Sequence, residues 1–121
     1  MTLLVNDIID SDFEKATSLF TDDIWLAQYK FIIDHPQLVN LFKDWKSDNK
    51  DIADFDKVIK SISLIDKEQY NLEYFTLEDV DFISVEFKSN PIFPGYTFDK
   101  TFIIAVQELD DGTMKIAGID Q

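Results

Sequence analysis

The sequence predicts an α+β domain in which N-terminal helices pack on a C-terminal antiparallel β-meander. In the first half of the chain, apolar residues recur at intervals of three and four, the spacing of one helix face. From about residue 70 the interval approaches two, and β-branched and aromatic residues become dense, as in strands. With 121 residues, 45% of them hydrophobic, the chain is sufficient for one domain over 1–121, helical at about 11–61 and sheet at about 70–120.

Four helices are expected in the first half. Ser11 and Glu14 have the spacing of a capping box and predict a helix that starts there. A second helix is expected over 22–34, because its apolar residues follow a helical period until Pro36 disfavours helical geometry. Pro36 suits the first turn of a third helix that runs to about Lys46. A fourth is expected over 51–61, although the alternation at 60–65 also fits a strand.

The second half is expected to form strands joined by tight turns. Phe98–Leu109 contains a run that is apolar on both sides, which is typical of a central strand. The Asp111-Gly112 pair that follows predicts a hairpin, because the turn needs positive φ, which Gly adopts without strain. The other expected segments are a weak strand at 70–77, a clearer strand that places Ile83, Val85 and Phe87 on one face, a loop at 89–96 and a return strand at 113–120.

The residue types that catalysis and metal binding most often require are scarce. The chain has no Cys and one His, which excludes thiolate nucleophiles, disulfides, Fe–S clusters and multi-histidine metal sites within one chain. We expect His35 to end a helix before Pro36 rather than act as a general base, because no partner nucleophile is identifiable. The acid-rich stretch 44–56 lacks the central Gly and final Glu of a calcium loop. We therefore expect no catalytic residues, no metal and no cofactor, and the protein is not expected to be an enzyme.

Charge narrows the choice of partners. The chain has 24 acidic residues against 11 basic residues, all of them Lys, and a formal net charge of −13. Such a field repels nucleic acid and anionic lipid, so neither is an expected partner. The N-terminus lacks a basic region followed by a long apolar run, and no stretch approaches 18 consecutive apolar residues. We expect a soluble, cytoplasmic protein.

The order of helices followed by a curved meander resembles the cystatin-like cone fold of nuclear transport factor and ketosteroid isomerase. This resemblance implies a pocket between the helices and the concave sheet, which the 17 aromatic residues could line. It supports the alternative function, a small-molecule-binding protein or an isomerase-like enzyme. The isomerase role requires a carboxylate base, a tyrosine and a second, protonated carboxyl, and no residues of this sequence are assigned to these roles.

In size, acidity, lack of Cys and richness in Lys, Asp, Ile and Phe, the chain is similar to small bacterial immunity proteins of the contact-dependent toxin–immunity kind. That resemblance implies a non-catalytic protein, a monomer or weak homodimer, that neutralises a basic toxin such as a nuclease. It is the preferred hypothesis because it explains the large negative net charge, the strongest global feature of the sequence. An exposed aromatic residue flanked by acids would suit such a partner, although a plain solvated face is the commoner meaning of this pattern. The expected contact residues are Glu78, Asp79, Asp81, Phe82 and Glu86.

Overall fold

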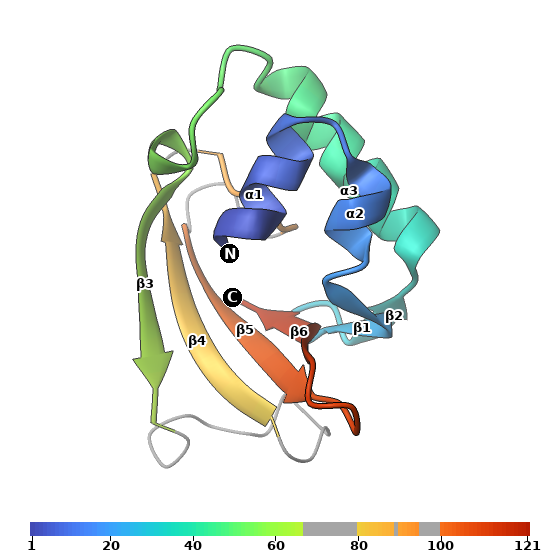
Figure 1. Cartoon of the computed structure of the whole chain (residues 1–121). Helices are drawn as coiled ribbons and strands as arrows, with labels where there is room; N and C mark the ends of the chain where they lie inside the picture. The colour runs from blue at the N-terminus through green and yellow to red at the C-terminus, as the bar shows by residue number, and fades with distance from the viewer. Residues whose placement is uncertain (67–79, 89, 95–99) are drawn as a thin grey trace.

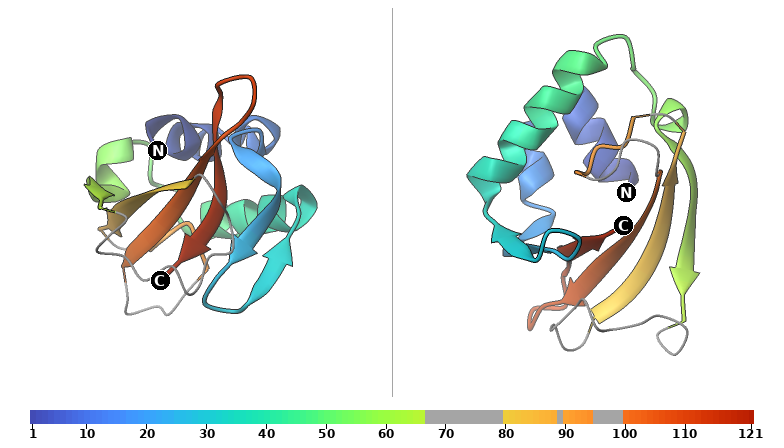
Figure 2. Two further views of the ribbon diagram at one scale, coloured as in Figure 1. Left: turned by 90° about the horizontal axis from the view of Figure 1, so that it is seen from below. Right: turned by 180° about the vertical axis from the view of Figure 1, so that it is seen from behind.

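The computed structural model describes residues 1–66, 80–88, 90–94 and 100–121. Within these ranges, helices lie on the concave side of a curved six-stranded sheet, as Figures 1 and 2 show from three directions. This confirms the predicted α+β class and its cone-like arrangement. None of the described helices has the length and apolarity to cross a membrane. The elements are α1 (Thr2–Ile9), α2 (Phe13–Thr17), β1 (Phe20–Leu26), β2 (Phe31–Ile33), α3 (His35–Asp48), the 3-10 turn η1 (Phe55–Lys57), β3 (Ile59–Ile65), β4 (Val80–Phe87), β5 (Thr101–Glu108) and β6 (Met114–Asp120).

The sheet has the strand order β2-β1-β6-β5-β4-β3. Strands β3 to β6 pair antiparallel with their neighbours in sequence, which confirms the predicted meander. Strand β1 then adds to β6 in parallel and pairs antiparallel with β2. The backbone N–H of Ile116 donates to the carbonyl of Leu19 over 2.9 Å, beside this parallel pair. The beginning and the end of the chain are therefore joined through the sheet.

Helix α3 confirms the third predicted helix. The Asp34 carboxylate accepts from the Gln37 backbone N–H, and the Gln37 side chain accepts from the Asp34 N–H, each over 3.0 Å. This capping box, with Pro36 in the first turn, starts the helix. The side chains of Leu38, Phe42 and Trp45 are buried against the core.

The first predicted helix is present but shorter and capped by a different residue. The cap of α2 is Asp12, whose carboxylate accepts from the Lys15 N–H at 3.2 Å, whereas Ser11 has φ of 61° and lies outside the helix. The helix ends at Thr17, and Phe20 begins a strand. Helix α1 precedes α2 and was not expected; its buried residues are Leu4, Val5, Asp7 and Ile8.

The predicted helix over 22–34 is wrong, because that segment forms the β1–β2 hairpin. Its apolar residues also fit a strand period, and Ile24 and Leu26 are buried while Asp22 and Asp23 are exposed. Pairing with β6, which lies almost 100 residues further along the chain, decides between the two periods. Local spacing carries no information about this distant neighbour.

The predicted helix over 51–61 is also wrong. The alternative interpretation of 60–65 as a strand is correct. Only Phe55–Lys57 form a single 3-10 turn, and β3 begins at Ile59. The backbone of β3 pairs with β4, which satisfies the hydrogen-bonding groups on that side of the strand in place of a helix. The expected strand at 70–77 lies outside the described residues.

The predicted hairpin after β5 is confirmed. Gly112 has φ of +85°, and its N–H donates to the Leu109 carbonyl over 2.9 Å. The Asp111 carboxylate accepts from the Thr113 N–H at 3.0 Å and from its hydroxyl at 2.6 Å. These hydrogen bonds from Thr113 lower the pKa of Asp111, since they favour the charged form. The turn fixes where β6 begins, and hence the position of Met114.

Replacing Gly112 by Val is expected to lower the free energy of unfolding by about 1 kcal/mol, because a β-branched side chain is strained at positive φ. A Cβ at this position would meet no atom within 4 Å, so the cost comes from the backbone alone. Urea denaturation measures it. The control is Gly112→Asn, which tolerates the left-handed region and should lose less; equal losses for Val and Asn would contradict the assigned turn.

Candidate functional site

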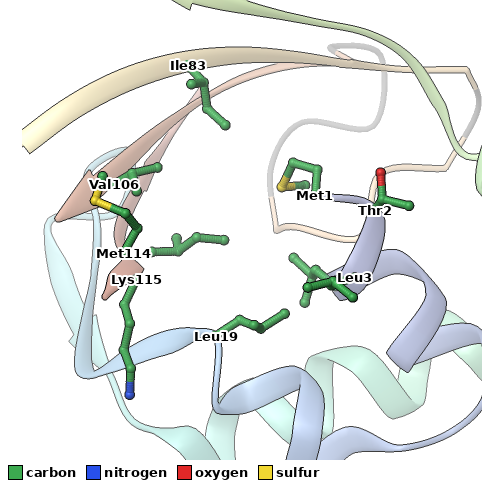
Figure 3. Close-up of a pocket in the computed structure, with 10 residues that line it drawn as sticks. Met1, Thr2, Leu3, Leu19, Ile83, Val106, Met114 and Lys115 are labelled. Atoms are coloured by element: carbon green, nitrogen blue, oxygen red, sulfur yellow. The ribbon is translucent and has the colours of Figure 1, made fainter. Parts of the chain in front are cut away.

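A cavity of about 340 Å³ lies between the first turn of α1 and the concave face of the sheet. Figure 3 shows side chains from α1 on one side of this space and side chains from β4, β5 and β6 on the other, with Leu19 between them. The lining residues are Met1, Thr2, Leu3, Leu4, Leu19, Ile83, Val106, Met114, Lys115 and Ile116. The cavity therefore joins the N-terminal helix to the sheet.

Strand register explains why these strand residues share one space. Val106 pairs with Ile116, so both side chains leave the sheet on the same face. Ile83 pairs with Ile104, two residues from Val106, and therefore lies on that face as well. Helix α1 anchors itself to the core through other side chains, and Leu3 remains 64% exposed at the mouth of the cavity.

The chemistry of the lining is mainly apolar. Its polar groups are the Thr2 hydroxyl, the Lys115 amine and the Met1 amino group, whose pKa is lowered by burial because burial disfavours the charged form. The Lys115 amine is directed away from the apolar side chains (Figure 3). Among the described lining residues there is no carboxylate, tyrosine or histidine. These lining residues are suited to binding an apolar group.

The expected aromatic lining of the pocket is wrong for the described lining residues, which are aliphatic or contain sulfur, apart from Thr2 and Lys115. Most of the described phenylalanine rings instead lie in the core. Phe87, Phe93 and Phe102 make edge-to-face pairs with ring centroids 5.5 to 5.9 Å apart, a geometry that favours burial together. Exposed apolar residues at opposite ends of the chain, such as Leu3 and Met114, would have been the better signal, but their proximity depends on the fold.

A second hollow of about 330 Å³ lies between α3 and the segment 90–94. The Trp45 indole N–H donates to the Asn90 carbonyl at 2.9 Å, and the Asn90 amide donates to the Asn49 side chain at 3.0 Å. The Asn49 amide in turn donates to the Trp45 carbonyl at 2.8 Å. These hydrogen bonds hold the segment 90–94 against α3. The hollow therefore follows from how the two segments pack, and we assign it no ligand.

The expected partner-binding residues do not form one exposed patch in the described structure. Glu78 and Asp79 lie outside the described residues. Asp81 is exposed, and Glu86 forms a salt bridge to Lys60 at 3.2 Å. Phe82 is 1% exposed, so the expectation of an exposed aromatic anchor is wrong: β4 is covered on both faces. Binding of a basic protein at the acids stays a prediction.

His35 was expected at a helix end, and this is wrong, because it is the first residue of α3. Its Nε2 lies 2.8 Å from the Thr21 carbonyl, to which it donates. The ring thus links the start of α3 to β1. In the part of the chain that the structure describes, no group of three or more His, Cys, Asp or Glu side chains has the arrangement of a metal site.

No family model and no curated protein matches the chain. Among solved structures, an NTF2-like protein from Cytophaga hutchinsonii is 15% identical, with 98% of this chain and 87% of that chain covered and a TM-score of 0.47. A ketosteroid isomerase-like protein from Erwinia carotovora atroseptica is 11% identical, with 98% and 85% covered and the same TM-score. At this identity the likeness concerns the fold alone.

These matches correct two expectations. Both similar structures are NTF2-like or ketosteroid isomerase-like, and neither is an immunity protein, so the predicted toxin–immunity identity is contradicted. The expectation that the protein is not an enzyme is also withdrawn, because one of the two similar structures is described as ketosteroid isomerase-like; this says nothing of an activity of the present chain.

Proposed function

We propose that the protein binds a small apolar molecule in the cavity between α1 and the concave face of the sheet. The observation that carries this proposal is the lining itself, in which aliphatic and methionine side chains from four separate elements surround about 340 Å³ of space. That volume falls within the range of small-molecule sites, roughly 300 to 1,000 Å³. The function is thus the alternative that the sequence left open.

Exposure at the mouth supports a ligand rather than an unused gap. Leu3 is 64% exposed and Met114 is 49% exposed, and both line the cavity. A bound apolar molecule would cover these side chains and gain roughly 25 cal/mol for each Å² of apolar surface removed from water. The free protein leaves this surface in contact with solvent.

Replacing Leu3 by Ser is expected to weaken the binding of 1-octanol about tenfold, because a ligand contact worth about 1.5 kcal/mol is lost. The dissociation constant is measured by calorimetry or by NMR titration. Leu3 is largely exposed in the free protein, so the substitution should leave the fold intact.

The matched control is Ile32→Ser. Ile32 is 59% exposed on β2 and does not line the cavity, so the same apolar-to-polar change should leave octanol affinity unaltered. Equal affinities for wild type and Leu3→Ser would contradict the site, and absence of octanol binding to the wild type would contradict the proposed function.

A further inference from the structure

We infer that the ligand of this cavity is a cationic amphiphile, an organic amine whose apolar part fills the cavity and whose ammonium group lies beside Glu108. The inference rests on the proposed function and names the chemical class of its ligand. It comes from the register of β5 and β6, which places an acidic side chain at the edge of the apolar lining.

The position of Glu108 follows from two relations. Glu108 pairs with Met114 across β5 and β6, so both side chains leave the sheet on the same face with Cβ atoms roughly 5 Å apart. Glu108 is also two residues from Val106 along β5, which again places it on the concave face. Met114 and Val106 both line the cavity, so Glu108, which is not itself one of the lining residues, borders them on the same face of the sheet.

Glu108 is available for a ligand. It is exposed, and within the described part of the chain it makes no ion pair. Asp81 is opposite Val106 in the register and lies on the same face, where it adds a second negative charge near this edge. A diagonal pair of this kind has Cβ atoms roughly 7 Å apart. Asp81 has an interaction of its own, so the ammonium group is assigned to Glu108 alone.

Lys115, the lysine among the described lining residues, leaves the sheet on the face opposite to Glu108. Lys115 pairs with Gln107, and alternation along β6 places its side chain on the face opposite to Met114. Figure 3 shows its amine end directed away from the apolar side chains of the cavity. Met1 lies across the cavity from Met114, on the side away from Glu108, and burial lowers the pKa of its amino group.

Electrostatics then select the head group. The chain carries a net charge of −13, and Glu108 adds a local carboxylate, so an anionic head group is repelled and an ammonium group is attracted. An uncharged alcohol of the same length buries the same apolar part in the cavity but makes no interaction between charges. The order of affinity expected for one chain length is amine, alcohol, carboxylate.

The test compares octylammonium, 1-octanol and octanoate at pH 7 with the full chain, below the concentrations at which they aggregate. Octylammonium is expected to bind about tenfold more tightly than octanoate, with octanol between them, and the difference should shrink as salt is raised. In Glu108→Gln, the affinity for octylammonium should fall about threefold while that for octanol stays constant.

The matched control is Asp110→Asn, which removes the same charge two residues away in the hairpin turn and should leave all three affinities close to wild type. If octanol binds but octylammonium binds no more tightly, or if Glu108→Gln and Asp110→Asn have equal effects, the inference is overturned while the proposed function stands. If none of the three probes binds, the proposed function itself fails.

Discussion

Replacing Phe82 by Ala is expected to lower the free energy of unfolding by about 3 to 5 kcal/mol, the range for removing a buried aromatic side chain. Phe82 is 1% exposed and packs in a cluster with Ala27, Val80 and Ala105 on the face of the sheet away from the helices. Total stabilities of such domains are about 5 to 15 kcal/mol, so the loss would be a large share. Urea denaturation should show a lower midpoint at unchanged slope.

The control for this variant is Phe31→Ala. Phe31 is 46% exposed on β2, and its ring packs against the ring of Tyr29, at 5.8 Å between centroids. Its loss should cost about 1 kcal/mol. Similar midpoints for the Phe82 and Phe31 variants would show that Phe82 is not the buried residue that the structure describes.

Phe82 shows what the sequence pattern of β4 could and could not predict. Ile83, Val85 and Phe87 were correctly placed toward the core, but the opposite face was taken as solvated. Val80 and Phe82 make that face apolar too, which is the two-sided pattern of a covered strand. The same pattern was correctly interpreted in β5. In β4 the two-sided pattern could be recognised only once the structure showed that β3 and β5 lie on either side of this strand.

Elements with strong local signals were predicted well. The Asp111-Gly112 turn and the helix after Asp34 depend on residues within four positions of one another, and both are present. The β1–β2 hairpin depends on β6, almost 100 residues away, and its sequence fits a helix equally well. Long-range pairing therefore decided the segment that local spacing could not.

The candidate site could not be predicted from the sequence, because it also depends on contacts between distant segments of the chain. Its lining comes from α1, Leu19 and three strands, and no two of these segments show their proximity in the sequence. The net charge was visible from composition and suggested a basic protein partner over a large surface. We propose a more local role for part of that charge, because Glu108 pairs with Met114, which lines the cavity.

Replacing Val106 by Trp is expected to lower the affinity for 1-octanol about 100-fold. Val106 is half-buried, and its side chain borders the empty space of the cavity (Figure 3), so an indole there would occupy the volume that the ligand needs. Loss of the burial of about three to four methylene groups, at about 0.8 kcal/mol each, corresponds to such a change. Because the cavity is open to solvent at Leu3 and Met114, the larger ring has space and the fold should persist.

The matched control is Gln107→Trp, which adds the same indole at the next position of β5. Gln107 pairs with Lys115, and its side chain leaves the opposite face of the sheet, so octanol affinity should match the wild type. Circular dichroism and urea denaturation of both variants separate occlusion from unfolding. A folded Val106→Trp variant that binds octanol as tightly as Gln107→Trp would show that the ligand does not occupy this cavity, because Val106 lines it and Gln107 does not.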